Sequence, residues 1–466
     1  MGRLSPLQPA TFLGRMGVAR ADITPPAGIH SRAWGAAAHD TASGIHQPLT
    51  TTALAILPDD GPPRLIVGAD ICWISDVADF VRFREAIAAA AGMPGQIENV
   101  LLAVSHTHSA PPLDRSRVNA PGGDLLAPYM EAMRDAFAEV TAAAIANAVP
   151  AQLVVETGSC HLAVNRDLPY DDADHYACGF HPGAPTDTTL LVGRITERGT
   201  GRILGTLVNY ACHPTTLAWE NTLISPDYVG TMREVVEGMT ASAPCLFIQG
   251  ASGELSAREC HQGETAMAEK HGRQLGYAVL STLEGMLPPD SQLNYMGLKE
   301  SGARLAYWRY GPLQAHPGQQ HLQTETHRFP LPIKPTWPSR AEFQRLHAET
   351  TDRVQKEIYF RRIMARHQVG DGDHYAAEYT YWRLGDILLT TTPGEMYSQY
   401  QRDLRAALPG NPLLVGNLVN GSYGYIVPAE FFSTDLYQAQ MTPFAPESLA
   451  ASIAFSTERL AELARA

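Results

Sequence analysis

The stretch Val100–Pro112, VLLAVSHTHSAPP, joins five apolar residues to two histidines that stand two positions apart. The apolar run predicts a short buried strand, and the polar residues and prolines after it predict a loop. In an extended chain residues i and i+2 face the same side, so His106 and His108 can converge on one ion or one substrate. The alternative is a pair of surface histidines at the end of a strand. A zinc site needs further ligands from elsewhere in the chain.

The composition limits what kind of protein this chain can be. It has 466 residues, a formal net charge of −13 at pH 7 and a pI near 5.7. This acidic balance disfavours binding to nucleic acid and attachment to anionic lipid through basic patches. Charged residues make up 18% of the chain and hydrophobic residues 45%, which is ordinary for a globular protein. We therefore expect an enzyme that acts on a small molecule. The sequence leaves its oligomeric state open.

No segment predicts export or a membrane span. The first twenty residues lack an uninterrupted apolar core followed by a small-residue cleavage site, so we find no secretory signal. No apolar stretch is long and charge-free enough to cross a bilayer. The six cysteines form no C-x-x-C pair, and without an export signal we expect them to be reduced. These features favour a cytoplasmic enzyme.

Runs typical of strands and helices follow one another along the chain. Residues 189–195 and 203–208 flank a glycine-containing turn and predict a β-hairpin. Residues 130–148 and 264–286 have helical periodicity. The sequence Ser339-Arg340-Ala341-Glu342 is typical of a capping box and predicts a long helix that reaches toward Arg366.

The organisation predicts one unit rather than several. We find no repeat of fixed period and no Gly/Ser linker. The simplest fold is therefore mixed α/β, a single large catalytic domain over residues 15–466 with residues 290–375 as a more peripheral arm. Strands that repeatedly end in polar, glycine-bearing loops suit a sheet core with an active site built from strand-end loops.

Two further residues that suit a metal ion stand at the ends of predicted strands. His213 ends the apolar run 207–212 and is followed by proline, so the chain leaves the sheet there. Glu395 follows a buried-looking strand and a Pro-Gly turn, near the start of a predicted helix. Each has a commoner role when taken alone, His213 as a hydrogen-bonded structural histidine and Glu395 as an acid favoured by the helix dipole.

Three other loops carry polar groups. Tyr423 and Tyr425 stand among glycines, where a phenol oxygen can face an ion or pack over a turn. Arg166 follows a strand-like run and can clamp an anion or polarise a carbonyl, although a surface salt bridge is the commoner role. The loop 249–256, QGASGELS, offers glycine amides for an oxyanion, but it is not a G-x-S-x-G elbow. No acid and histidine are identified that would complete a serine triad.

Other metallohydrolase patterns fit less well. The metallo-β-lactamase type needs an acid and a histidine directly after its H-x-H, where Ser109, Ala110 and Pro111 stand here. A barrel of the amidohydrolase type needs regular βα alternation, which we do not find. The motif H-E-x-x-H is absent.

With these motifs assembled, the chain resembles the neutral/alkaline, non-lysosomal ceramidase family, specifically its zinc-dependent catalytic domain. The resemblance runs through most of the chain and rests on the order of short motifs. They are Gly17–Pro26, Ser105–Ser109, Asn165-Arg166, His213–Thr215, Gly250–Glu254, Pro393–Glu395 and the loop that ends near Tyr425. The family usually continues into a C-terminal β-sandwich domain, whereas this chain ends at Ala466, so we expect the catalytic domain without it.

The resemblance implies a zinc ion held by His106, His213, Glu395 and a tyrosine. The family's tyrosine loop commonly reads N-x-Y-x-x-Y, and here Ser422 replaces its first tyrosine. Tyr425 is therefore the better candidate ligand, and Tyr423 is the fallback.

The resemblance also implies catalytic roles outside the ligand set. It places His108 and Arg166 beside the substrate carbonyl and gives a role to Ser256, although water activated by a metal removes the need for a serine nucleophile. The family's Gly-Asp pair becomes Gly253-Glu254 here.

These residues predict a zinc-dependent hydrolase that cleaves an amide bond with metal-activated water. Zinc held by imidazoles and a carboxylate lowers the pKa of bound water from 15.7 to about 7. The missing domain and the missing export signal favour an N-acyl substrate smaller or more soluble than a sphingolipid. An esterase or lactonase on the same site, a non-catalytic binding protein that retains the scaffold, and a serine hydrolase that uses Ser256 remain as alternatives.

Overall fold

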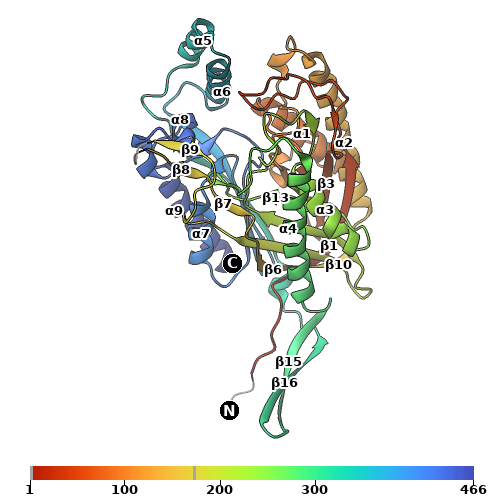
Figure 1. Cartoon of the computed structure of the whole chain (residues 1–466). Helices are drawn as coiled ribbons and strands as arrows, with labels where there is room; N and C mark the ends of the chain where they lie inside the picture. Colours follow the sequence, from red (N-terminus) through yellow and green to blue (C-terminus); the bar gives the residue numbers. More distant parts are fainter. Residues whose placement is uncertain (1–3, 172–174, 466) are drawn as a thin grey trace.

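The computed structural model describes residues 4–171 and 175–465 (Figure 1). The fold is mixed α/β, as the sequence predicted, and its largest sheet has eight strands in the order β13-β11-β10-β6-β1-β3-β4-β5. β5 pairs in parallel with β4, and β13 pairs in parallel with β11, while the other neighbours are antiparallel. The strands are β1 (Thr11–Asp22), β3 (Thr50–Leu57), β4 (Arg64–Ala69), β5 (Val100–Val104), β6 (Val149–Ser159), β10 (Thr189–Glu197), β11 (Ile203–Tyr210) and β13 (Cys245–Gln249).

This sheet curls, so that strands far apart in its order lie against each other. β13, at one edge, contacts β3, β4 and β5 at the other. Close approach requires a small residue there, because a Cβ at Gly68 of β4 would come within 2.6 Å of the Leu246 side chain of β13. The curl brings the carboxyl ends of β5 and β11 into one region of the molecule, and polar side chains follow both strands.

A second sheet fills the inner side of the curl. Its order is β17-β18-β19-β21, and its strands are β17 (Leu322–Pro332), β18 (His374–Leu384), β19 (Ile387–Thr391) and β21 (Leu413–Gly416). Trp382, Leu389 and Leu414 of this sheet join one apolar cluster with residues such as Leu54 and Leu246 of the first. The burial of this cluster holds the two sheets together.

Helices cover the outer faces of both sheets (Figure 1). α1 and α2 pack on the β1–β5 half of the large sheet, α3 and α4 pack on the other half, and α7 and α9 cover the second sheet. These helices are α1 (Val77–Ala90), α2 (Leu126–Ala146), α3 (Tyr228–Met239), α4 (Thr265–Gly285), α7 (Ser398–Ala407) and α9 (Ser448–Arg465). No helix in residues 4–171 and 175–465 has both the length and the apolarity that crossing a bilayer requires.

The predictions of local structure are confirmed in most places and wrong in one. α2, α4 and the β10–β11 hairpin lie where the sequence placed them. The long helix predicted after Ser339 is instead two helices, α5 (Arg340–Glu349) and α6 (Arg353–Val369). Ser339 caps α5 as expected, but Asp352 caps a new helix by accepting a hydrogen bond from the backbone N–H of Gln355. The helical pattern therefore continues in the sequence while the chain changes direction.

The region 290–375 contains elements of very different placement. β15 (Ser291–Glu300) and β16 (Arg304–Pro312) form a hairpin that projects from the body, whereas β17 lies in the second sheet (Figure 1). The boundaries of a domain over residues 15–466, with this region as its arm, stay a prediction.

The remaining short elements are β2 (Gly44–Ile45), β7 (Ala163–Asn165), β8 (Asp167–Pro169), β9 (Tyr176–Cys178), β12 (Leu223–Ile224), β14 (Leu255–Ala257), β20 (Glu395–Met396), β22 (Tyr425–Ile426) and α8 (Tyr437–Met441), with 3-10 turns at 97–99, 115–117, 123–125, 317–320 and 429–433.

Candidate metal centre

Three of the predicted ligands meet where strands from both sheets end. His106 follows β5, His213 follows β11, and Glu395 begins β20 after the turn that leaves β19. One possible ligand atom from each lies within 4.8 Å of the other two, and all three residues are buried. The Oε2 atom of Glu395 lies 3.0 Å from Nε2 of His213 and 3.5 Å from Nε2 of His106. This group could hold a metal ion.

The backbone fixes the orientation of both imidazoles. Nδ1 of His106 lies 2.7 Å from the carbonyl oxygen of Cys72, and Nδ1 of His213 lies 2.6 Å from that of Ser252. A carbonyl oxygen can only accept a hydrogen bond, so each Nδ1 carries the proton and each Nε2 turns its lone pair toward the centre. His106 has a φ of 68°, a left-handed conformation that is uncommon outside glycine and that tends to occur at functional sites.

The charges at the centre suit a cation. Burial, with the nearby charge of Arg166, lowers the pKa of His213 to about 4, so this imidazole is neutral at pH 7. Burial alone would raise the pKa of Glu395, but the imidazoles of His106 and His213 hold it well below its usual range. A carboxylate and two imidazoles whose Nε2 atoms face the centre are a donor set that zinc accepts. The residues present therefore fit the predicted metal.

The tyrosine loop places its two phenols differently. The hydroxyl of Tyr425 lies 3.3 Å from Nη2 of Arg166, and its ring stacks on His213 with centroids 6.3 Å apart. Tyr423 instead packs its ring against Tyr375 and Phe444, at 5.1 Å from each. Of the two candidates, Tyr425 is the one whose phenol group lies beside the group of His106, His213 and Glu395, which we call the cluster.

His108 and Arg166 lie next to the cluster without belonging to its tightest group. Nε2 of His108 is 3.3 Å from Nε2 of His106. The ring of His108 contacts the rings of Trp34 and Trp73, with centroid distances of 5.2 Å and 5.9 Å. Burial, together with His106 and His213, lowers the pKa of His108 well below its usual value. Its Nδ1 atom is buried without a hydrogen-bond partner among the described residues.

Arg166 is held in the same region by its guanidinium group. Nη2 donates to the carbonyl oxygen of Gly253 at 2.7 Å and lies 3.3 Å from Nε2 of His213. Its Nε is buried and has no hydrogen-bond partner in the described part of the chain. Arg166 therefore brings a fixed positive charge to the centre and keeps one donor free.

Ser256 occupies a different position from the other predicted residues. It lies in β14, its side chain is fully buried, and its hydroxyl donates to the backbone oxygen of Ala257 at 3.4 Å. Its backbone pairs with His213 as an isolated β-bridge. Ser256 is not among the residues that line the cavity beside the cluster. This placement suits a support for His213 better than a nucleophile.

A cavity of about 450 Å³ opens beside the cluster. His106, His108, Arg166, Glu395 and Tyr425 line one side of it. The rest of the lining is mostly apolar and includes Trp34, Trp73, Val354, Ile358, Phe360, Met364 and Met441.

The sequence reasoning missed the residues of this apolar wall. On α6 the lining residues Val354, Ile358, Arg361, Ala365 and Gln368 recur every three or four positions, which is the spacing of one helix face. The spacing of this set is readable in the sequence, but Arg361 and Gln368 interrupt its apolar pattern. Nothing in it showed that the face lines a cavity rather than packing on a core.

The comparisons with known proteins agree with this geometry. The family model described as neutral/alkaline non-lysosomal ceramidase, N-terminal, matches residues 15–251, which is half of the chain. No curated protein sequence gives a significant match.

Two solved structures share the fold. The crystal structure of neutral ceramidase from Pseudomonas aeruginosa matches with a TM-score of 0.67 and 18% identity, over 97% of this chain and 74% of that chain. A structure described as ceramidase complexed with C2 matches with a TM-score of 0.68 and 18% identity, over 97% of this chain and 75% of that chain. At such low identity the likeness concerns the fold, and the family assignment rests on the matched half of the sequence. By that match the chain belongs to the neutral/alkaline non-lysosomal ceramidase family and is a ceramidase-like hydrolase.

Proposed function

We propose that this protein is a zinc-dependent hydrolase that cleaves the carbon–nitrogen bond of an amide with water. The observation that carries the proposal is the buried group of His106, His213 and Glu395, whose ligand atoms lie within 4.8 Å of one another at the side of an apolar cavity. Such a group of two imidazoles and a carboxylate, facing a space that can admit a carbonyl compound, is typical of catalytic zinc sites.

His106, His213 and Glu395 would hold the metal, with Tyr425 as a fourth group at its side. When bound, zinc supplies a water molecule that ionises near neutral pH and a positive charge for the substrate carbonyl. The backbone carbonyls of Cys72 and Ser252 keep the two imidazoles aimed at the centre, since each accepts a hydrogen bond from Nδ1.

Arg166 and His108 would carry the remaining chemistry. The guanidinium group of Arg166, which lines the cavity, can stabilise the negative charge that develops on the carbonyl oxygen of the substrate. His108 is neutral at pH 7, because burial lowers its pKa, so it can take up the proton that the attacking water loses. The same imidazole can then deliver this proton to the nitrogen of the leaving amine. Trp34 and Trp73 hold the ring in place on two sides.

The apolar wall supports an N-acyl substrate of modest size. The cavity of about 450 Å³ lies in the lower part of the range of about 300–1,000 Å³ that ligand pockets usually occupy. Trp34, Trp73, Ile358 and Met364 offer apolar contacts for an acyl chain or a ring. We therefore propose a substrate smaller or more soluble than a two-chain lipid, with its acyl part against this wall.

Metal analysis followed by a panel of N-acyl amides, esters and lactones tests the proposal. We expect one zinc ion per chain, amide hydrolysis that stops after chelation, and recovery of the rate when zinc is added back. Faster cleavage of esters or lactones than of matched amides would overturn the amide assignment. A zinc-free protein that is inert toward the whole panel would favour a binding role. Chelator-resistant activity with covalent labelling of Ser256 would favour a serine hydrolase.

A further inference from the structure

The hairpin of β15 and β16 projects from the body of the molecule (Figure 1). Its two strands pair from Ser291↔Pro312 to Glu300↔Arg304, with one register shift between Tyr295 and Gly297. At about 3.3 Å per residue, a ten-residue strand of this kind is roughly 33 Å long. From here on the arm means residues 291–312 alone, which are the first part of the region 290–375.

One face of the arm is apolar between its base and its tip. Residues paired across two antiparallel strands face the same side, and alternate pairs share a face. With the register shift included, one face carries Leu293, Tyr295, Leu298, Ala306, Trp308 and Tyr310. The rings of Tyr295 and Trp308 touch on it, with centroids 5.3 Å apart. Leu298 is nevertheless 55% exposed and Tyr310 is 63% exposed.

The other face is mixed and the tip is charged. The opposite face carries Asn294, Lys299 and Arg309 beside the exposed apolar residues Leu305 and Tyr307. At the tip Glu300 and Arg304 form an ion pair across the strands at 3.1 Å. A hairpin that enters a membrane end-on would need an apolar tip, because a charged group in hydrocarbon is costly. The arm therefore suits a partner that it meets along its side, in water.

A two-stranded ribbon is only marginally stable in water when nothing packs against either of its faces. On the apolar face Leu298 and Tyr310 are more than half exposed, and Leu293, Tyr295 and Trp308 between them are only partly buried. Exposed apolar side chains that lie together in this way mark interaction sites. A partner that covers the apolar face would remove both costs.

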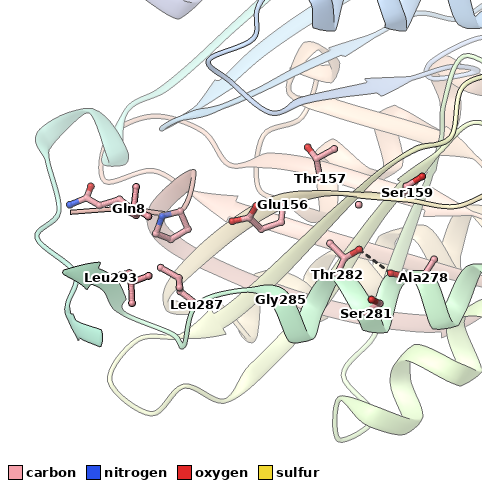
Figure 2. A pocket seen from close by; sticks show the side chains of 13 residues that line it. Gln8, Glu156, Thr157, Ser159, Ala278, Ser281, Thr282, Gly285, Leu287 and Leu293 are labelled. Carbon is pink, nitrogen blue, oxygen red and sulfur yellow. Dashed lines mark hydrogen bonds between the residues drawn. The ribbon is translucent and has the colours of Figure 1, made fainter. Parts of the chain in front are cut away.

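A hollow of about 530 Å³ lies at the base of the arm (Figure 2). It is lined by Leu7 and Gln8 of the N-terminal segment, by Glu156 of β6, by residues near the end of α4, and by Leu293 of the arm itself. The N-terminal segment is joined to the arm there, since the backbone groups of Leu7 and Leu293 exchange two hydrogen bonds of 2.9 Å. The apolar face of the arm thus runs directly into this hollow.

Charge decides between a second copy of the chain and other partners. Lys299, Arg304 and Arg309 against Glu300 give the arm a net charge of +2, while the whole chain carries −13. The body of another copy is therefore acidic, and the hollow at its base carries the acid Glu156. An anionic membrane would attract the arm but repel the body that carries it.

We propose that the arm docks with the arm of a second copy, apolar face against apolar face and antiparallel. A twofold axis then uses the same patch on both copies, as isologous dimers do. This arrangement places the cationic tip of each arm, with Lys299 and Arg304, at the acidic hollow at the base of the other. The six apolar residues of each arm cover one another along their common length.

Sedimentation of the full chain across a range of concentrations tests the proposal with two matched variants. Leu298→Ser/Tyr310→Ser changes the apolar face, and Leu305→Ser/Tyr307→Ser removes the same residue types from the opposite face. We expect the wild type to form a dimer. The first variant should raise the dissociation constant of this dimer by about 30-fold or more. The second variant should change it by less than about threefold.

Three results would overturn the proposal. One is a wild type that stays monomeric up to about 100 μM, a concentration at which even weak specific dimers form. Another is an equal loss of dimer in both variants, because the docking face would then not be the apolar one. The third is a monomer that sediments with phosphatidylglycerol vesicles and loses this binding in Leu298→Ser/Tyr310→Ser, which would make the partner a membrane.

Discussion

The metal centre and the apolar wall line the same cavity but come from different parts of the fold. At the centre, His106 and His213 are fixed by backbone carbonyls, and Glu395 lies against both. These residues come from chain segments that follow strands of both sheets. The wall comes largely from α6, whose Ile358 and Met364 offer side chains of adaptable shape. The histidines of the centre are thus fixed by strand-end backbone, whereas α6 is anchored by polar residues such as Arg361 and Gln368 and offers apolar side chains to the cavity.

This difference teaches that the two regions can change independently. A substitution at the centre alters the ligand set or its protonation, and the reaction is lost whatever the substrate. A substitution on α6 alters the space offered to the acyl part and leaves the ligand set in place. We therefore expect the strand ends to determine the reaction and α6 to determine the choice of substrate.

The largest effect is expected for His106→Ala. Loss of an imidazole ligand should remove the bound zinc and lower turnover by at least about a thousandfold, since even the loss of a group that merely supports a ligand costs about 10- to 100-fold. Zinc content and initial rates measure this. His271→Ala, which removes a fully buried histidine outside the cluster, should keep its zinc. Stoichiometric zinc at a wild-type rate in His106→Ala would reject the ligand assignment.

A smaller effect is expected for His108→Ala. This variant should keep one zinc ion and lose about 100-fold in kcat, because it removes the group proposed to carry the proton while leaving the ligands untouched. Paired measurements of zinc content and kcat separate the two roles. If zinc is lost instead, His108 is a ligand and the roles of His106 and His108 are exchanged.

The pH dependence of zinc binding sharpens the contrast further. Burial lowers the pKa of His213 to about 4 from an ordinary value of 6.5, so a proton competes with the metal at this nitrogen only near and below pH 4. Zinc should stay bound at pH 5.5, and its affinity should fall by about tenfold for each pH unit below 4. Zinc content after dialysis, with circular dichroism to monitor folding, measures this. Release of zinc already near pH 6.5 would mean that His213 has the pKa of an exposed imidazole, and it would contradict this prediction.

The smallest effect is expected at the wall. Met364→Trp adds bulk to the cavity and should lower kcat/KM for long acyl chains by about tenfold, since apolar pockets discriminate by about 10- to 200-fold for small changes in size. Zinc content and the rate with a short acyl group should stay near wild type. Met239→Trp, at a methionine that is 71% exposed on α3, is the matched control. Equal losses for long and short substrates would show that the wall is coupled to the centre.

The centre could be predicted from the sequence only in part. Few residue types bind zinc, and His106, His213 and Glu395 each follow a strand-like run where a loop begins, which made them candidates. Their choice as one ligand set, with His106 rather than His108, and the choice of Tyr425 over Tyr423 came from the family resemblance. The positions of His108 and Arg166 beside the cluster agree with the same resemblance.

The rest depends on long-range packing that periodicity does not contain. The break between α5 and α6 follows from the capping of a new helix by Asp352, which a continuous helical pattern hides. The curl of the large sheet rests on close contacts such as that of Gly68 with β13. Without the curl, the sequence gives no reason for α6 to lie over a cavity beside strands that are distant in the chain.

Anomalous diffraction from crystals of the zinc-loaded protein, recorded at the zinc absorption edge, tests the central claim most directly. The account predicts one peak among Nε2 of His106, Nε2 of His213 and a carboxylate oxygen of Glu395, at about 2.0–2.2 Å from each. A peak elsewhere in the molecule, or full hydrolytic activity in crystals that show no peak, would contradict it.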